Sequence, residues 1–588
     1  MALPSSKPFN PSCSAGARVL PKTPGAGPAR LSASDLAAAA AFICLAGWAW
    51  WCYRHFQCDD AFIAYRYVNN LLHGRGWVYN PGERVNGATS PLHILVITLL
   101  ARLIGDIPTA AHFLGALCLA SAAWLCYRLL ARAGTPEGGL AAGLLLATSP
   151  FLLSTFGMET MLYLALAAAA LYWYHTRRLL LSAAALGLLI VTRPDGILLA
   201  LVLLLHSLIA RRRFPLAPAA LAAALALPWF VFSTRYFGSP WPNTFAARMA
   251  QGAAGYNIEF FQGAFFWAGF SLRQSLWYFA LLPCAIAGTL ALALWARPYL
   301  PLLLWPAVYF LAYSLLGVPY QHWYYAPVLL GLIAASALWP LWIENGKTAP
   351  RLRSGWGEAE RSRSPAPRLA FLWALLLLFP IAAGNLFLLT GHDCYLRLRS
   401  ERSWQTIHGL IALSSAGVWL PLSIALLAAA AAWALRRRPR MARWALAAAV
   451  FLPVIAAQTR LNYLHSLTFP TPQIVAYREV GTWLNRRTSP DATVAAWEIG
   501  AIGYYSDRPI LDYLGLITPE ARAAVARRDF KWWLRQRPPD YVVVRDPPGG
   551  FEQAALDDPL FSERYRPAVV LRSPNWLPMT IHRRAESN

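Results

Sequence analysis

Long runs of apolar residues dominate the chain and are separated by short polar segments. A run of about 18 or more apolar residues matches the helix length that crosses the hydrocarbon core of a bilayer. A soluble helix would show a polar face, and the run from Ile197 to Ile209 shows almost none. Backbone polar groups within lipid must be bonded internally, so each run is predicted as a helix. The pattern predicts about thirteen spans. They lie near residues 35–53, 109–130, 138–156, 160–176, 179–193, 195–210, 215–236, 276–296, 300–317, 323–344, 368–390, 416–435 and 441–457.

Arginine follows every second predicted span, which predicts the orientation. With a cytoplasmic N-terminus, all these basic loops lie in the cytoplasm, as the positive-inside rule requires. The loop 54–108 and the tail 459–588 then lie outside, and the three arginines of the outside loop 391–415 fit poorly. A span at the short apolar segment 91–105 would invert all later loops, so this segment is predicted as an interfacial or partly embedded helix.

The polar segments divide the chain into regions. Residues 1–34 are predicted as a disordered basic N-terminus, 35–458 as the transmembrane region, and 346–367 within it as a cytoplasmic basic linker. Residues 459–588 are predicted as an external soluble α/β domain. In it, 473–487 reads as a helix, and 493–497, 510–513 and 541–545 read as strands.

Composition narrows the classes of partner. The 588 residues are 57% hydrophobic and carry a net charge of +24. Much of this charge lies in loops between apolar runs, which favours a lipid bilayer over a nucleic acid as partner. The cysteines show no metal-ligand spacing, and no metal ligand or firm cofactor is predicted. Carboxylates could hold Mg²⁺, so a requirement for a divalent cation stays open.

The external loop holds the most informative motif, QCDDAFIAYRYVNNLLHGRGWVYNPGERVNGATSP, at residues 57–91. A helical apolar stripe is predicted on one side of it, with the acidic pair Asp59 and Asp60 at the helix start. Asp59, Arg66 and Asn70 would project from the opposite side of a helix that lies on the membrane surface. The acidic pair could simply cap the helix, or one carboxylate could act as a general base or substrate anchor.

The run DDAFIAYRYVNNLLHGRGWVYNPGERVNGATSP resembles the first external loop of GT-C glycosyltransferases, in particular the terminal arabinofuranosyltransferases of cell-wall arabinan and their bacterial relatives. Weaker likeness extends to GMET at 157–160, TRPDG at 192–196, PNTF at 242–245 and EIGAIGYY at 498–505. The chain departs from the expected pattern at Asn86, Ala88 and His93, where an acidic, an aromatic and a Trp residue are expected. These departures leave the identity of the sugar open.

The resemblance implies a GT-C-like membrane fold and an enzyme at the cell (inner) membrane. It would transfer a sugar, with arabinofuranose as one candidate, from a polyprenyl-phosphate donor to an external glycan, lipid or protein. Asp59 or Asp60 would be the catalytic base that deprotonates the acceptor hydroxyl. The phosphate leaving group needs cationic partners more than a proton donor.

Further site residues are predicted from charge and position. Arg66 and Arg193 are the candidate partners of the donor phosphate, because guanidinium pairs well with phosphate. Arg66 could equally be a solvated interfacial charge, and Arg193 could simply pair with Asp195 at a turn. The aromatic cluster 320–325 could line the entry of the lipid or form a membrane belt. The remaining candidates for substrate binding are Asp195, Glu159, Glu83, Arg84, Asn243, His322 and Tyr324.

Two other functions remain open on the sequence alone. A transporter or flippase would place ionisable groups near the midplane of the membrane on broken helices, often in two related halves. Arg193 and Asp195 fit this weakly, and no internal repeat is visible. A non-catalytic assembly protein would tolerate changes at Asp59 and Asp60. The sequence leaves the acceptor, the stereochemistry of transfer and the role of the tail undetermined.

Overall fold

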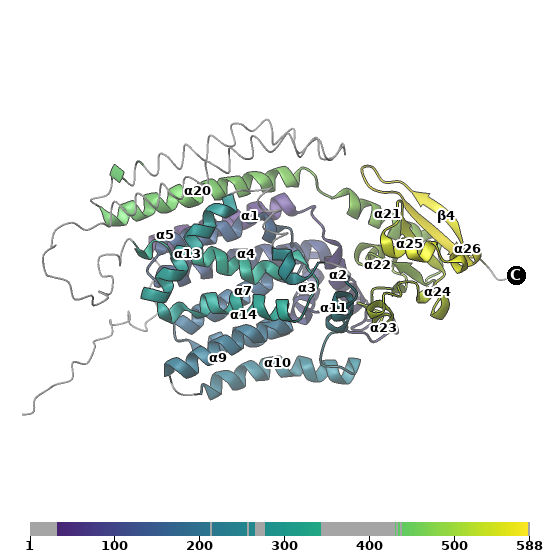
Figure 1. Ribbon diagram of the computed structural model, residues 1–588, viewed down its shortest axis with the longest axis horizontal. Coiled ribbons are helices and arrows are strands. Elements are labelled where there is room, and N and C mark those ends of the chain that lie inside the picture. The colour runs from purple at the N-terminus through teal and green to yellow at the C-terminus, as the bar shows by residue number, and fades with distance from the viewer. Residues whose placement is uncertain are drawn as a thin grey trace, which may run out of the picture.

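The computed structural model describes residues 32–211, 214–255, 258–264, 277–342, 430, 433–434 and 438–585. Most of the predicted N-terminal segment 1–34, the linker 346–367, the span 368–390, the loop 391–415 and most of the span 416–435 lie outside these residues. The described chain forms an elongated helical bundle with the tail at one end (Figure 1).

Helices occupy the predicted spans within the described residues. The bundle contains α1 Ala33–Tyr53, α4 Ile107–Arg132, α5 Pro136–Ala147, α6 Pro150–Leu153, α7 Thr160–His175, α8 Leu179–Thr192, α9 Ile197–Arg211, α10 Leu216–Phe237, α13 Trp277–Trp295, α14 Pro301–Leu315, α15 Ala326–Ser336 and α20 Pro439–Ser466. Short 3-10 turns lie at η1 Pro194–Gly196, η2 Arg297–Tyr299 and η3 His322–Tyr325. Six helical segments in the described residues are long and apolar enough to cross a membrane by length and composition, and the count of about thirteen spans stays a prediction.

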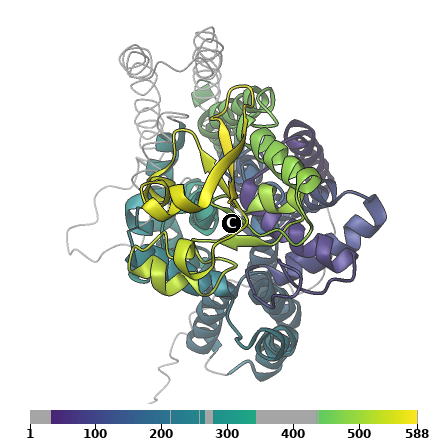
Figure 2. The ribbon, with the colours of Figure 1, turned by 90° about the vertical axis from the view of Figure 1, so that its right-hand side faces the viewer.

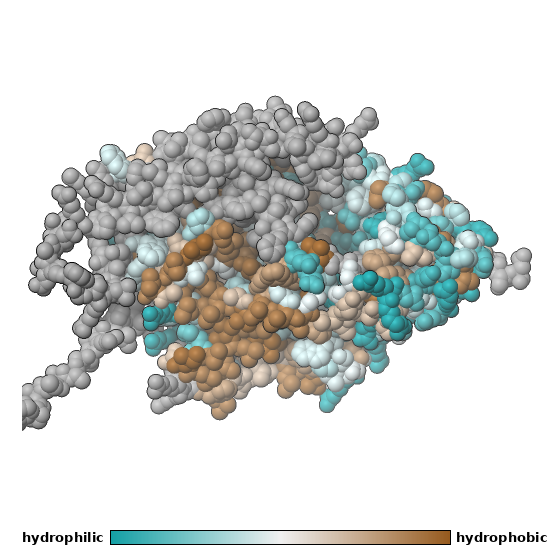
Figure 3. Space-filling model, in the orientation of Figure 1, coloured by the Kyte–Doolittle hydropathy of each residue, from teal (hydrophilic) through white to brown (hydrophobic). Residues whose placement is uncertain are grey.

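The surface of the described chain differs between the bundle and the tail. Apolar side chains gather over the described helices of the bundle, and polar ones gather over the tail (Figure 3). Long apolar helices cannot hide all their side chains in a narrow bundle, and Leu201 and Leu205 of α9 are 52% and 60% exposed. Such an apolar outer surface is what contact with lipid tails requires.

Three helices lie where the bundle meets the tail: α2 Asp59–Leu72, α3 Pro91–Ile104 and α11 Asn243–Ala253. The chain turns from α3 into α4 at Gly105, whose φ of 87° suits glycine, and the Asp106 carboxylate then accepts the Thr109 N–H at 2.8 Å. The predicted helix at 91–105 is therefore present, with Leu99 and Leu103 exposed and Ile94 and Ile97 buried. Its place relative to the membrane stays a prediction.

The environment predicted for α2 is wrong. The helix begins at Asp59 and has its apolar stripe, but it packs against α3 on one side and α22 Gly500–Ser506 of the tail on another. Arg66 is 1% exposed and Asn70 is fully buried. The polar side therefore faces the tail rather than solvent, because segments more than 400 residues downstream cover it.

The tail contains a five-stranded mixed sheet of order β2-β1-β3-β5-β4. Its strands are β1 Val494–Ala496, β2 Ile510–Asp512, β3 Tyr541–Arg545, β4 Tyr565–Leu571 and β5 Met579–Arg584. β1 pairs in parallel with β2 and β3, at Val494↔Ile510 and Val494↔Tyr541, while β5 pairs antiparallel with β3 and β4. The other helices are α21 Pro472–Arg487, α23 Ala521–Ala526, α24 Trp533–Gln536, α25 Gly550–Leu556 and α26 Pro559–Arg564.

The three strands and the helix predicted for the tail are present. The sequence prediction missed β4 and β5. β4 is an edge strand that contains Pro567 and is mostly solvent-facing, so it lacks the apolar alternation of a half-buried strand.

Buried contacts tie the tail to the bundle. One continuous apolar core runs from the bundle through Phe62 and Tyr65 of α2 to Ile502 of α22 and Val494 of β1. Within the bundle, α20, which leads into the tail, is fixed by buried polar contacts: Tyr53 Oη donates to Asn462 at 2.9 Å, and Asn462 Nδ2 donates to the Thr148 carbonyl at 2.7 Å. Viewed from the end that carries the tail, the tail lies in front of the helices of the bundle (Figure 2).

Candidate functional site

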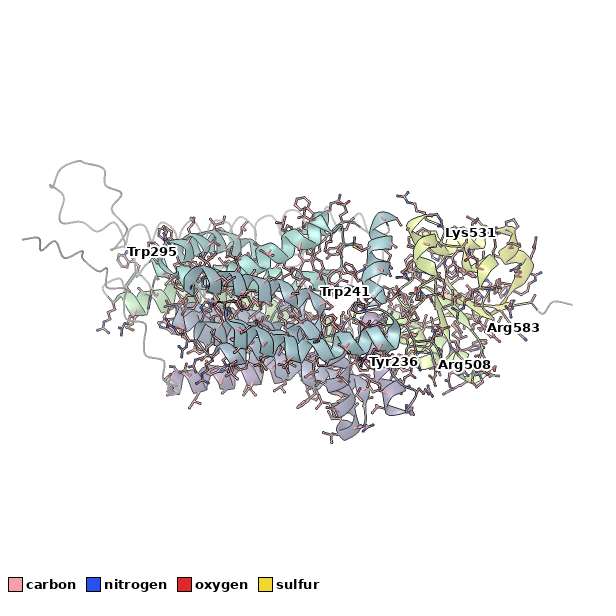
Figure 4. All side chains as sticks on the ribbon, turned by 90° about the horizontal axis from the view of Figure 1, so that it is seen from below. Tyr236, Trp241, Trp295, Arg508, Lys531 and Arg583 are labelled. Atoms are coloured by element: carbon pink, nitrogen blue, oxygen red, sulfur yellow. The ribbon has the colours of Figure 1, made fainter. Side chains whose placement is uncertain are left out.

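A cavity of about 350 Å³ lies where the bundle meets the tail. It is lined by α2, the loop before α3, the residues just before α7, the turn between α8 and α9, α11, the end of α14, η3 and one residue of the tail, Leu516. Trp241, just before α11, also lines it, is 56% exposed, and marks this junction in Figure 4. The charged residues of the lining are Asp60, Glu159, Arg193, Asp195 and Arg248.

Asp60 and Arg248 face one another in this cavity. An Asp60 carboxylate oxygen lies 3.8 Å from Arg248 Nη2, and 28% of the Asp60 side chain is exposed. Burial raises the pKa of Asp60 above its usual range, and the positive charge of Arg248 opposes that shift. Arg248 Nη1 also donates to the Gln251 side chain on α11 at 3.0 Å. The cavity thus brings an accessible carboxylate and a cation close together.

Asp59 points in another direction, because successive residues of a helix do not share a face. Its carboxylate accepts the N–H groups of Gly500 at 3.1 Å and Ala501 at 2.8 Å, at the start of α22. Burial raises the pKa of Asp59 to about 7, although these two N–H groups lower it. Burial and the nearby charges of Asp59 and Asp60 also raise the pKa of Glu498. The two carboxylates therefore have different surroundings: Asp60 lines the cavity, and Asp59 binds the tail.

Arg193 lies at the other side of the cavity in a dense polar cluster. Its Nη2 lies 2.7 Å from Asp195 Oδ2 and 2.9 Å from the Tyr313 hydroxyl, and Nη1 lies 3.9 Å from Glu159. The ring of Tyr324 lies 5.1 Å from the guanidinium. These contacts fit the predicted ion pair with Asp195 and also hold a second cation at the cavity wall.

The structure corrects the prediction for Arg66, which does not line the cavity. Its guanidinium donates to the backbone carbonyls of Tyr79, Gly503 and Arg508. A fully buried guanidinium with three carbonyl acceptors has a structural role, and Arg66 is removed from the candidate site.

Four other predicted residues also lie outside the cavity lining. Glu83 forms an ion pair with Arg537 of the tail. Arg84 lies over the ring of Tyr236 at 4.8 Å, and His322 Nε2 lies 3.3 Å from Ser154 Oγ. Asn243 donates to the carbonyls of Gly515 and Leu516, both at 2.8 Å, so it fastens the tail rather than facing the cavity.

Sequence reasoning missed Arg248. A usable signal was present, since Arg248 follows the PNTF segment after the predicted span 215–236. The alternation of spans puts that segment outside, where the positive-inside rule makes arginine unusual. Among the described residues, no group of three or more His, Cys, Asp or Glu side chains could hold a metal ion.

Comparisons with known proteins bear on the fold. Residues 88–235 match a family described as dolichyl-phosphate-mannose-protein mannosyltransferase, and residues 469–584 match a family described as a domain of unknown function. No curated protein matches the chain.

Two crystal structures of ArnT from Cupriavidus metallidurans are similar. The one bound to undecaprenyl phosphate is 17% identical, with a TM-score of 0.55 over 94% of this chain and 98% of that chain. The apo structure is also 17% identical, with a TM-score of 0.58 over 93% and 98% of the two chains. The chain has the GT-C fold. The prediction of that fold, in a multi-pass membrane protein, is therefore confirmed, while the particular likeness to arabinofuranosyltransferases stays a prediction.

Proposed function

We propose that this protein is a membrane glycosyltransferase that moves one sugar from a polyprenyl-phosphate donor to an acceptor hydroxyl on a glycan, lipid or protein. The observation that carries the proposal is the opposed pair of Asp60 and Arg248 in one cavity of a GT-C fold. Undecaprenyl phosphate bound to the structurally similar ArnT supports the class of donor. The matched mannosyltransferase family supports sugar transfer as the reaction.

The proposed chemistry assigns a role to each charged group. Asp60 accepts the proton of the acceptor hydroxyl as the oxygen forms a bond to the anomeric carbon. The bond from that carbon to the phosphate oxygen breaks, and the electron pair stays on the lipid phosphate. Arg248 and Arg193 stabilise this anion, and Glu159 and Asp195 keep Arg193 oriented. The raised pKa of Asp60 makes it a stronger base than a solvated aspartate.

The size of the cavity supports transfer of a single sugar. A volume of about 350 Å³ lies near the lower end of ligand pockets, which run from roughly 300 to 1,000 Å³. The sequence resemblance makes a pentose such as arabinofuranose one candidate, and a hexose is the other. We further propose that the enzyme lies in the cell (inner) membrane with its N-terminus in the cytoplasm and its tail outside.

The test is to purify the full chain in lipid nanodiscs and supply polyprenyl-phosphate pentoses and hexoses with a mixed glycan acceptor. Release of free polyprenyl phosphate together with a glycosylated product supports the proposal. In reconstituted vesicles, movement of an intact donor between leaflets without bond cleavage would instead support the flippase. A chain that neither binds nor consumes any donor of the panel would contradict both.

A further inference from the structure

We propose that the tail is a structural part of the transfer site and that Asp59 is a positioning residue for Asp60. This inference rests on the proposed transfer reaction and assigns a role to the segment that matches a domain of unknown function. The contrasting possibility is a tail that folds apart from the site and binds the acceptor by itself.

The first contact set joins α2 to α22. Asp59 accepts the N–H groups of Gly500 and Ala501. Arg66 of α2 donates to the carbonyls of Gly503 and Arg508. The hydroxyl of Tyr79, in the loop after α2, donates to the Ile499 carbonyl. Both ends of α22 are therefore bound by the loop that carries Asp60. We call this contact set the α2–α22 clasp.

Two glycines make the α2–α22 clasp close. A Cβ at Gly500 would collide with the backbone carbonyl of Asp59, and a Cβ at Gly503 would collide with the Tyr79 hydroxyl. Neither collision can be relieved by a flexible side-chain end, because a backbone group and a buried tyrosine are in the way. The position of α2 is thus set directly by the backbone of the tail.

A second contact set brings the tail into the cavity wall. The buried Asp512 carboxylate accepts N–H groups from Leu514 at 2.8 Å, Ile517 at 3.1 Å and Leu516, which folds residues 512–517 into a tight loop. Asn243 at the start of α11 holds the same loop through two carbonyls. The loop places Leu516 in the cavity lining.

The geometry connects these contacts to the proposed chemistry. Asp60 is the residue after Asp59 in the first turn of α2, whereas its partner Arg248 lies on α11. The tail is hydrogen-bonded to α2 through Asp59 and to α11 through Asn243. Loosening the clasp would therefore move the carboxylate relative to the cation, and a misplacement of about 1 Å can cost about 100-fold in rate.

The experiment compares full-length variants in nanodiscs. Asp59→Ala removes both acceptor oxygens, and Asp59→Asn keeps one oxygen that can accept an N–H. Asp557→Asn is the matched control, because Asp557 is an exposed residue of the tail whose carboxylate accepts the Gln553 side-chain N–H at 2.6 Å, away from both the clasp and the cavity. Hydrogen–deuterium exchange reports how well the backbone N–H groups of α2 are protected, independently of activity, and kcat and KM measure transfer.

We expect faster exchange in residues 59–66 of Asp59→Ala and a kcat lower by about 100-fold, with the donor KM within about twofold. Asp59→Asn should fall between wild type and Asp59→Ala, and Asp557→Asn should match wild type. The Asp59→Asn variant also keeps the inference testable if Asp59→Ala does not fold. Unchanged exchange and kcat in both Asp59 variants, or a raised acceptor KM with normal kcat, would overturn the inference. If exchange rises but wild type transfers no sugar, the proposed function fails while the clasp stands.

Discussion

Replacing Asp60 by asparagine separates its proposed chemistry from its contribution to folding. Asparagine keeps the size and one carbonyl oxygen but cannot accept a proton from the acceptor hydroxyl. A general base contributes about 100- to 10,000-fold to a rate, so we expect kcat to fall by that range.

The structure predicts little loss of stability in this variant. The ion pair with Arg248 is 3.8 Å long, and 28% of the Asp60 side chain is exposed, so solvent screening limits its contribution to about 1 kcal/mol or less. Loss of the carboxylate should also leave Arg248 more available to the donor phosphate. We therefore expect a donor KM no higher than that of wild type.

The assay is release of radiolabelled sugar from the lipid donor under single-turnover conditions, with thermal unfolding in the same nanodiscs. Asp557→Asn is again the matched control, and its kcat should equal that of wild type. An Asp60→Asn enzyme with full kcat and unchanged unfolding would refute the assignment of the base. A variant that loses activity only because it unfolds would leave a melting temperature clearly below that of the control.

The remaining predictions concern the cations and pH. Arg248→Gln removes charge-assisted hydrogen bonds worth about 1.5–3 kcal/mol, so the Kd for donor should rise by about 10- to 100-fold in a binding titration. Arg66→Met leaves three carbonyls without their donor, at about 1–3 kcal/mol each if buried, and should lower the melting temperature, while Asp557→Asn at an exposed residue should not. Because Asp60 must be ionised to act as base, kcat should rise with pH through its raised pKa, and this dependence should vanish in Asp60→Asn. The pKa of Asp59 is about 7 in the folded protein and near 3.8 when unfolded, so the folded state binds more protons between these values. Stability should fall as pH rises from about 4 to 7, and Asp59→Asn should flatten this slope in thermal unfolding.

The sequence predicted the local structure of the site well. Apolar runs predicted the bundle helices, and the helical period of apolar residues within 57–91 predicted the helix that begins at Asp59. Both signals depend on residues within a few turns of each other. The GT-C fold came from motif resemblance and was confirmed by the structural likeness, while the count of about thirteen spans stays a prediction.

The surroundings of α2 could not be predicted in this way. Arg66 was a plausible phosphate partner until the carbonyls of Gly503 and Arg508, more than 400 positions away, proved to be its acceptors. The division of Asp59 from Asp60 has the same origin, because it depends on which segment of the tail packs on the first turn of α2. The roles of these side chains depend on long-range packing, which a local sequence pattern cannot predict.

We propose that sugar transfer takes place in the cavity between Asp60 and Arg248. The most direct measurement is a cryo-electron microscopy structure of the full chain with a non-hydrolysable polyprenyl-phosphate sugar analogue. We expect the phosphate to lie within hydrogen-bonding distance of Arg248 or Arg193 and the anomeric carbon to face the Asp60 carboxylate. An analogue bound elsewhere, with this cavity still empty, would contradict this proposal.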